Sequence, residues 1–326
     1  MARTVAFVVN RTRIRAWPQV SERCQAVAAA HGWDPLLLET AVDDAGTKLA
    51  HRAVAAGAGL VFAMGGDGTV RACAQALAGG QVPLAIVPRG TANLVATALG
   101  IPSSLGAALA VGFGPHERRI DLAIADGITF AAMAGIGLDA ALGVGFGRHE
   151  RRIDLAVADG ITYAAMAGIG VDAAVVGATP GGFKARAGWL AYAAAGARHA
   201  LGPHTTFELR LDGAPLTRRA RSVVVGNAGL LPGGFALLPD ARLDDGLLDV
   251  GILAPSSPLG WARVAYRIMA GSRYEDGQLE RYRARRIEIR AAAELPREVD
   301  GEVIEPGRSL TVTVAPAALL VRVPAG

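Results

Sequence analysis

The sequence predicts an α/β domain followed by a mostly antiparallel β domain, and three observations support this fold class. Short apolar runs alternate with helical patterns in the N-terminal third of the 326 residues. Beyond residue 118, strand pairs separated by turn signals replace that alternation. A glycine-rich stretch separates one early apolar run from the next helical pattern. We therefore assign residues 1–112 to the α/β domain and residues 113–309 to the β domain, with residues 310–326 returning to the first.

Four apolar runs predict the strands of a parallel sheet that is buried on both faces. They are "TVAFVV" at residues 4–9, "PLLLET" at 35–40, "LVFAMG" at 60–65 and "PLAIVP" at 83–88. Helical patterns follow the first three runs, at residues 21–32 with Ser21 as N-cap and Gly32 as C′, at 43–57 and at 69–80. The alternation is typical of a doubly wound domain, in which ligands bind beyond the carboxyl ends of the strands.

The β domain is predicted from a series of strand-like stretches at residues 119–135, 205–229, 247–255, 285–291 and 309–323. Asp-Gly dipeptides at residues 126–127, 159–160 and 212–213 fall between apolar runs, as tight hairpin turns require. Two helices, at residues 185–200 and 258–269, interrupt the strands.

Composition indicates an ordinary globular chain, with 52% hydrophobic and 19% charged residues. The two cysteines, Cys24 and Cys73, fall in predicted helices, which favours a reduced, cytoplasmic protein. The apolar run at the N-terminus is too short for a signal peptide. Pro102 and several glycines interrupt the uncharged stretch at residues 90–115, so we expect no spanning helix there.

The net charge of +4 would suit contact with nucleotide phosphates or an anionic lipid surface, although a value this small is more often background. Any membrane contact is therefore expected to be peripheral, on the inner face of the membrane. We expect no nucleic-acid partner.

The stretch "GGDGT" carries the strongest chemical signal in the sequence. Gly65, Gly66, Asp67, Gly68 and Thr69 lie where an apolar strand ends and a helix opens. Glycines let backbone N–H groups approach a phosphate, and the helix N-terminus adds the positive end of its dipole. Asp67 is placed to hold a phosphate-bound Mg²⁺ directly or through water. A plain glycine-rich turn is the alternative, which so specific a junction disfavours.

A second loop, "PRGTAN", follows the next predicted strand and offers Gly90, Thr91 and Asn93 at the same edge of the sheet. Alone this loop is a weak signal. Two Gly-Thr loops at the ends of successive strands favour one nucleotide cleft over two unrelated turns.

Two acidic stretches in the β domain are candidates for chemistry. "VDGE" places Asp300 and Glu302 on one face of an extended segment, where a carboxylate could take the proton from an attacking hydroxyl. A solvated Asp-Gly turn is the alternative. In "PDARLDDGLLDV", Asp244, Asp245 and nearby carbonyls could bind a hard cation, or could form an acidic turn.

These motifs, together with "RRIDLA" and "MAGIG", occur in an order that resembles the bacterial diacylglycerol kinase and lipid kinase family, and the actinobacterial members most. The resemblance spans essentially the whole chain, whereas "GGDGT" alone is shared with NAD kinases. It implies an ATP-binding α/β domain, a β-sandwich domain carrying the lipid site, and an active site in the cleft between them. It also allows a homodimer, which no sequence feature establishes.

The resemblance also implies roles for individual residues. ATP would be bound by Gly65 to Thr69, Thr91 and Thr40, with Asn10 matching part of an N-terminal element. Glu302 corresponds to the proton acceptor, with Asp300 beside it. Asp245 and the carbonyls of Arg242 and Leu247 match a structural Mg²⁺ site. The aspartate of "IDL" belongs to a network that reaches the catalytic Mg²⁺, and here it exists twice, as Asp121 and Asp154.

Three positions depart from the family pattern. The segment around residues 11–15 differs, Arg71 and Ala72 replace the usual Asn-Glu, and Leu94 stands where an acidic residue often follows the second loop. Losing that carboxylate would weaken a Mg²⁺ network. The sequence thus supports an ATP-dependent lipid kinase that uses Mg²⁺, with diacylglycerol as the expected lipid. The alternatives are a nucleotide- or lipid-binding protein with little catalysis and, disfavoured by "VDGE" and the acidic turn, a NAD kinase.

A tandem duplication lies at the domain junction, where residues 111–142 align with residues 144–175 at a spacing of 33 residues. Two copies are too few for a solenoid. Each copy is predicted to form a hairpin, and one phosphate site can use only one of the two aspartates. Asp154 is the expected choice because its hairpin runs directly into the downstream helix, and the other hairpin should extend the sheet or bulge outward.

Overall fold

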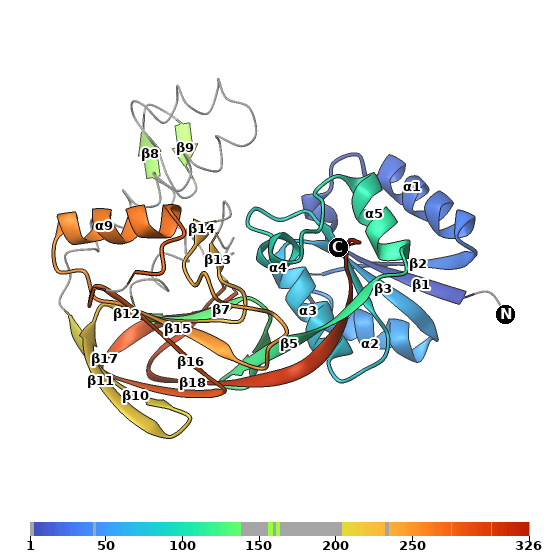
Figure 1. Cartoon of the computed structure of the whole chain (residues 1–326). Helices are drawn as coiled ribbons and strands as arrows, with labels where there is room; N and C mark the ends of the chain where they lie inside the picture. Colours follow the sequence, from blue (N-terminus) through green and yellow to red (C-terminus); the bar gives the residue numbers. More distant parts are fainter. Residues whose placement is uncertain are drawn as a thin grey trace.

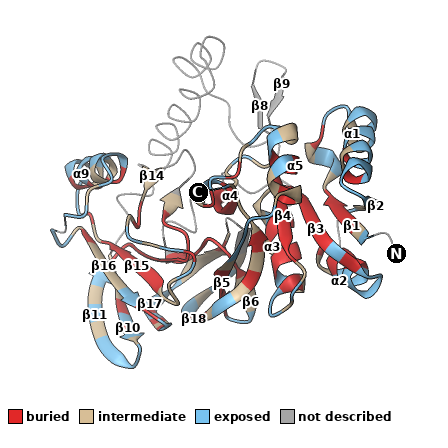
Figure 2. Ribbon diagram, turned by 45° about the vertical axis from the view of Figure 1, so that its right-hand side comes forward, coloured by how far each residue is buried: buried red, intermediate tan, exposed pale blue. Residues whose placement is uncertain are grey.

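A computed structural model of the chain describes residues 3–41, 44–137, 156–158, 161–163, 204–231, 235–274, 276–300 and 302–325. The N-terminal part contains the predicted parallel sheet. Its strands are β1 (Arg3–Val9), β2 (Trp33–Glu39), β3 (Ala58–Gly65) and β4 (Leu84–Pro88). They pair in the order β2-β1-β3-β4, all parallel. The apolar runs of β3 and β4 are buried nearly throughout, as a sheet covered on both faces requires (Figure 2).

Helices cover this sheet on two sides (Figure 1). They are α1 (Trp17–Ala30), α2 (Thr47–Ala55), α3 (Asp67–Leu77), the short α4 (Leu94–Ala98) and α5 (Leu105–Phe113), with a 3₁₀ turn at Arg11–Arg13. The rings of His31 and Phe113 stack at 4.8 Å where α1 and α5 end, whereas α2 packs against α3. The doubly wound α/β domain is thereby confirmed.

The predicted start of the first helix was wrong. The helix begins at Trp17, with Ala16 as N-cap and Pro18 in its first turn, and the Ser21 hydroxyl donates to the Pro18 carbonyl instead of capping. Proline fits the first turn because its missing N–H has no helical partner there. The C′ glycine is confirmed, since Gly32 follows the C-cap with φ +74°.

Apart from β8 (Ala156–Ala158) and β9 (Ile161–Tyr163), the remaining described strands belong to the β domain, where hairpins alternate with longer connections. The strands are β5 (Glu117–Ala125), β6 (Ile128–Phe130), β7 (Met133–Gly137), β10 (Thr205–Leu211), β11 (Ala214–Ala220), β12 (Ser222–Gly226), β13 (Leu230–Leu231), β14 (Phe235–Ala236), β15 (Leu248–Leu253), β16 (Leu279–Ala284), β17 (Arg286–Val299) and β18 (Glu302–Arg322). Helix α9 spans Pro258–Met269, as predicted. The helix predicted at residues 185–200 lies outside the described residues.

Two of the predicted Asp-Gly turns are present. Asp126 and Gly127 both have positive φ, as do Asp212 and Gly213, which is the conformation of a two-residue type I′ hairpin. The third dipeptide, residues 159–160, lies outside the described residues.

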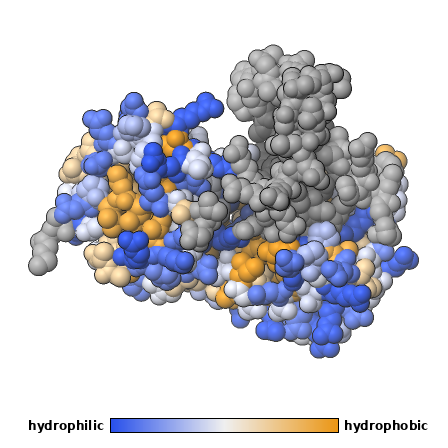
Figure 3. Space-filling view, turned by 180° about the vertical axis from the view of Figure 1, so that it is seen from behind, coloured by the Kyte–Doolittle hydropathy of each residue, from blue (hydrophilic) through white to orange (hydrophobic). Residues whose placement is uncertain are grey.

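The long strand β18 joins the two parts of the molecule. It pairs with β17 and β5, and at Val321 it lies beside Leu84 of β4, so that one path of hydrogen-bonded strands runs from the β domain into the α/β sheet (Figure 1). Seen from behind, both parts show apolar areas bordered by hydrophilic residues (Figure 3). No helix in the described ranges is both long enough and apolar enough to cross a bilayer.

The two repeat copies occupy different places. The first copy supplies β5, β6 and β7 of the large sheet. The second supplies β8 (Ala156–Ala158) and β9 (Ile161–Tyr163), which pair with each other as a separate two-stranded sheet. The register is the same in both hairpins, with Ala123 opposite Phe130 in one and Ala156 opposite Tyr163 in the other.

Candidate active site

The predicted nucleotide-binding residues meet at one edge of the α/β sheet. Val9, the last residue of β1, pairs with Glu39 and Met64, and Gly65 pairs with Pro88. The loops that follow all four strands therefore begin at the same level. Asn10, Thr40, Gly66 and Gly90 are the residues carried there, which is the edge where open α/β sheets bind ligands.

The two Gly-Thr loops touch each other through their glycines. A Cβ added to Gly90 would lie 2.6 Å from the Gly66 Cα and 2.8 Å from the Asn93 side chain, so neither the loop nor its neighbour has room for a side chain. The Arg89 N–H donates to the Gly65 carbonyl at 2.7 Å. Gly68, by contrast, has no heavy atom within 4 Å of an added Cβ, so the backbone there faces open space. One compact double loop results, with exposed backbone on its outer side.

Asp67 connects the two loops. Its carboxylate accepts the N–H of Asn93 at 2.8 Å and the N–H of Leu94 at 2.6 Å, so it caps the N-terminus of α4. Burial, and then the nearby Asp300 carboxylate, raises the pKa of Asp67 to about 6. Because the Leu94 contact uses the backbone, it does not depend on the side chain at that position, and the Leu94 side chain is buried.

Asp300 lies in the turn between β17 and β18, where its φ is +48°. The prediction that it lies in an extended segment was therefore wrong. Asp300 is also not a solvated turn residue. Its carboxylate accepts the N–H groups of Ala131 at 3.2 Å and of Ala132 and Met133 at 3.0 Å each. Burial raises its pKa, and Arg71 opposes that shift. Asp300 therefore fixes the hairpin turn against the loop between β6 and β7.

Arg71 bridges the two domains at this point. It lies one turn after Asp67 on α3, and its Nη1 donates to the Val299 carbonyl at 3.2 Å. The charge of Asp300 raises the pKa of Asp67, and the charge of Arg71 lowers the pKa of Asp300. The three side chains therefore form one electrostatic group. The motifs "GGDGT" and "VDGE", more than two hundred residues apart, are thus brought together.

Other predicted site residues are placed less completely. Glu302 opens β18 and pairs with Val299, but its side chain lies outside what the structure describes. Thr91 is exposed in the second loop, Thr40 is half-buried after β2, and the Asn10 side chain accepts the Thr12 hydroxyl at 2.7 Å. Thr69 is buried under Gly65.

The duplicated aspartate is described in one copy only. Asp121 is buried in β5, and its carboxylate accepts the Gly246 N–H at 2.6 Å and the Ala317 N–H at 2.7 Å. It ties β5 to the acidic turn and to β18. Asp154, the expected choice, lies outside the described residues, so its role stays a prediction.

The acidic turn is held by arginines. Asp244 pairs with Arg118 at 2.5 Å, and Asp245 pairs with Arg283 and also accepts the Leu247 N–H at 3.1 Å. A cation held by Asp245 and the carbonyls of Arg242 and Leu247 would have to share that carboxylate with Arg283. The Mg²⁺ site predicted there stays a prediction.

The residues at the loop edge suit a nucleotide-bound Mg²⁺ better than a metal held by protein alone. Within the described ranges, no group of three or more His, Cys, Asp or Glu side chains is arranged to hold a metal ion. Mg²⁺ commonly uses one or two carboxylates together with substrate phosphates and water. Burial, and then the charge of Asp300, raises the pKa of Asp67, and a bound cation would favour the charged form of this carboxylate.

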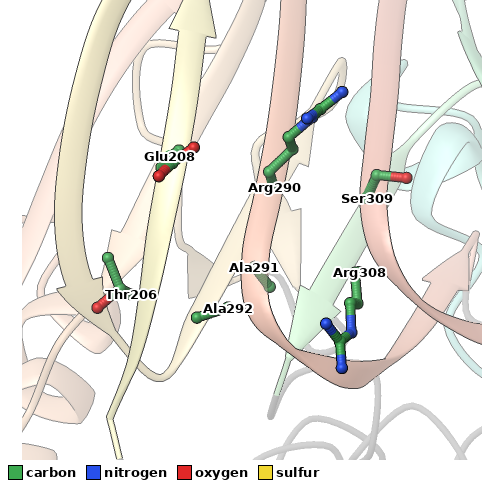
Figure 4. Close-up of a pocket in the computed structure, with 7 residues that line it drawn as sticks. All are labelled: Thr206, Glu208, Arg290, Ala291, Ala292, Arg308 and Ser309. Atoms are coloured by element: carbon green, nitrogen blue, oxygen red, sulfur yellow. The ribbon is translucent and has the colours of Figure 1, made fainter.

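A hollow of about 410 Å³ lies away from these residues, on the outer strands of the β domain (Figure 4). Glu208 on β10, Arg290 on β17 and Arg308 on β18 line it. It contains none of the predicted site residues, so we do not assign it to the active site.

Sequence reasoning missed the groups that hold the acidic side chains in place. These groups are the backbone N–H groups of Asn93, Leu94 and residues 131–133. The side chains of these residues give no indication of that role. Arg71 stood out as a departure from the family pattern, but nothing in the sequence indicated that it reaches the Val299 carbonyl.

Comparison with known proteins covers nearly the whole chain. Residues 4–125 match the family described as diacylglycerol kinase catalytic domain, and residues 165–323 match the YegS C-terminal NAD kinase beta sandwich-like domain. The unmatched residues between them, 126–164, are longer than one 33-residue repeat.

Several relatives carry the name probable lipid kinase YegS-like, among them the following two. One, from Pseudomonas aeruginosa, is 32% identical over 317 residues, 94% of this chain and 91% of its own. The other, from Pseudomonas fluorescens, is 32% identical over 299 residues, 90% of this chain and 87% of its own. A crystal structure of a diacylglycerol kinase from Bacillus anthracis has the same fold, with a TM-score of 0.69 at 19% identity over 99% of this chain and 97% of that one.

Proposed function

Because the chain belongs to the diacylglycerol kinase and lipid kinase family that includes the YegS-like proteins, we propose that it transfers the γ-phosphoryl group of ATP to a lipid hydroxyl. Diacylglycerol, which would give phosphatidic acid, is the substrate that we propose. The observation that carries this proposal is the meeting of Asp67 and Asp300 from two distant motifs at the loop edge of the nucleotide domain.

The double loop suits the binding of ATP phosphates. Open backbone at Gly68 and the N-terminus of α3 offer N–H groups to an anion. Asp67, with Asp300 beside it, would hold the Mg²⁺ that accompanies the nucleotide. That ion would neutralise the charge developing on the transferred phosphoryl group.

The hairpin turn at Asp300 suits the positioning of a general base. Three backbone N–H groups fix the Asp300 carboxylate, so the backbone of Glu302, two residues on, is held in a defined place. We propose that Glu302 accepts the proton of the lipid hydroxyl while the hydroxyl oxygen attacks the γ-phosphorus of ATP. Asp300 itself already accepts three hydrogen bonds, which makes it a positioning residue in this account.

ADP formation by the full chain with ATP, Mg²⁺ and a panel of lipids tests the proposal. We expect ADP to form only with an added hydroxyl lipid, and fastest with diacylglycerol. Glu302→Gln should lower kcat by about a hundredfold or more while leaving ATP binding intact, since a positioned base contributes factors of this order.

A binding protein without catalysis is the second candidate, because Leu94 replaces an acidic residue beside Asp67. ATP binding without lipid-dependent ADP formation would favour it. Phosphorylation of NAD instead of any lipid would contradict the proposed acceptor.

A further inference from the structure

Helix α9 has an apolar outer face that no contact among the described residues accounts for. Of six large hydrophobic side chains exposed in the described parts of the chain, four lie on α9 or directly after it, at Leu259 (60% exposed), Tyr266 (69%), Met269 (47%) and Tyr274 (65%). Surface helices normally present polar residues to water on the face away from the core.

The other face of α9 is already used. Gly260, Val264 and Ile268 recur at four-residue intervals and are buried. Val264 and Ile268 belong to the core that extends across to the α/β domain. Figure 2 shows this division, with the buried side of α9 toward the sheet and the exposed side outward. The exposed residues are therefore a second apolar face, which packing against the described part of the chain does not require.

The residues between the apolar side chains are basic. Residues 258–274 contain Arg263, Arg267 and Arg273 and no acidic residue. Arg267 pairs with Asp276 at 2.5 Å and stacks at 5.0 Å on the Tyr274 ring, which holds that ring in place. Arg273 pairs with Asp240, but both side chains are largely exposed to solvent. Arg263 forms no salt bridge among the described residues, although its charge contributes to lowering the pKa of Asp276.

These residues surround a shallow hollow of about 650 Å³, lined by Ala262, Arg263, Tyr266, Arg267, Ala270, Ser272 and Tyr274. Leucine and methionine suit the acyl region of a bilayer, tyrosine the boundary with the headgroups, and arginine the anionic headgroups themselves. The combination favours a lipid surface over another protein.

The position of α9 also connects it with the active site. Helix α9 packs against β14, β14 pairs with β13, and β13 contacts α4, whose first N–H groups hold Asp67. Figure 1 shows these elements in sequence from α9 to α4.

We propose that the α9 surface, formed by Leu259, Arg263, Tyr266, Met269, Arg273 and Tyr274, docks on an anionic phospholipid bilayer. The inference deepens the proposed function and rests on it, because an enzyme that phosphorylates a membrane lipid must reach its substrate at that surface. Docking would bring the loops next to α4 close to the lipid hydroxyl.

Co-sedimentation of the full chain with vesicles tests the proposal. We expect binding to vesicles of phosphatidylglycerol and phosphatidylcholine, and weaker binding to phosphatidylcholine alone. The double variant Leu259→Ser/Tyr266→Ser should bind at least about tenfold more weakly, because it removes two large apolar side chains from the buried contact. Arg263→Gln should weaken binding about fivefold, and only on the anionic vesicles.

The matched control is Val54→Ser/Ile124→Ser, which removes the two exposed large hydrophobic side chains outside this surface, at 38% and 40% exposure. It should bind vesicles like the parent chain. All these positions are exposed, so melting temperatures should stay unchanged. The proposal would be overturned if the two double variants bound vesicles equally well. It would also be overturned if the parent chain bound anionic and neutral vesicles with the same affinity. A dimer that the Leu259→Ser/Tyr266→Ser variant dissociates without changing vesicle binding would overturn it too.

Activity separates this inference from the proposed function. The Leu259→Ser/Tyr266→Ser variant should turn over long-chain diacylglycerol in vesicles more slowly, and a water-soluble short-chain diacylglycerol at the parent rate. No turnover of either lipid, with vesicle binding still dependent on α9, would contradict the kinase reaction and leave the docking surface supported.

Discussion

Asp67 has a structural role in the fold and a proposed role in the reaction. Its two oxygens cap α4 through Asn93 and Leu94, which fixes the second Gly-Thr loop against the first. The charge of Asp300, across the domain boundary, also raises the pKa of this carboxylate. The sequence placed Asp67 at a strand-to-helix junction, but it could not show the capping contacts, because these depend on which loops become neighbours once the sheet has formed.

The ionisation of the Asp67 carboxylate should show in how the free energy of unfolding depends on pH. Its folded pKa is raised to about 6 from an ordinary 3.8, chiefly by burial. Between these values the folded chain binds more protons than the unfolded chain, so the free energy of unfolding falls as pH rises through this window. The shift of two units corresponds to at most about 3 kcal/mol.

Asp67→Asn should flatten that fall, because asparagine stays neutral. Thermal unfolding of both chains without metal, from pH 4 to pH 7, measures the effect. Asp249, whose pKa burial also raises to about 6, and Asp300, whose pKa burial also raises, should leave part of the slope in the variant. Parallel pH profiles of the two chains would contradict the assignment.

The elements that were predicted correctly are those whose pattern is local. The four parallel strands and α9 follow from continuous apolar runs and from helical periodicity. Two short helices, α4 and α5, were not predicted, because a stretch rich in alanine, glycine and leucine carries little periodic signal. The contact between Gly66 and Gly90 was also beyond the sequence, since glycine content is high throughout the chain.

The two loops should respond differently to an added methyl group. Gly90→Ala places a Cβ 2.6 Å from the Gly66 backbone, so the loops must separate. We expect a loss of about 1–3 kcal/mol in the free energy of unfolding, and weaker ATP binding. Gly68→Ala is the matched control for packing, because its Cβ meets open space within α3.

Gly68→Ala should therefore keep or slightly raise stability, by up to about 1 kcal/mol. It should nevertheless weaken ATP binding if the phosphates approach this backbone. Denaturant unfolding and nucleotide titration of both variants give the two quantities. Equal stability of the two variants would show that the loops do not pack as described.

At the scale of the whole molecule, β18 joins the two domains, and the first copy of the duplication supplies a hairpin of the large sheet. The strand β18 extends from the hairpin at Asp300 to β4, so one element connects the Asp300 turn with the nucleotide domain. The order of motifs indicated two domains with a cleft between them. The repeat alone could not show which copy enters the sheet, because the two sequences are nearly identical and only long-range pairing distinguishes them.

The described contacts give Asp121 a structural role that can be tested against Asp154. Asp121→Asn should lower the free energy of unfolding by about 2 kcal/mol, because it weakens two charge-assisted bonds in a buried place. Asp154→Asn is the matched variant in the second copy, and if Asp154 serves the site it should lower kcat. Equal losses from both, in stability and in kcat, would contradict the view that one site uses one aspartate.

The meeting of Asp67 and Asp300 in one phosphoryl-transfer site is the central claim, and a double-mutant cycle tests it most directly. Lipid-dependent ADP formation would be measured at saturating Mg²⁺ for the parent chain, Asp67→Asn, Asp300→Asn and the double variant. We predict large losses in kcat from each single change and little further loss in the double variant, because residues that act as a unit are not additive. Losses that multiply in the double variant would show two independent roles and contradict the account.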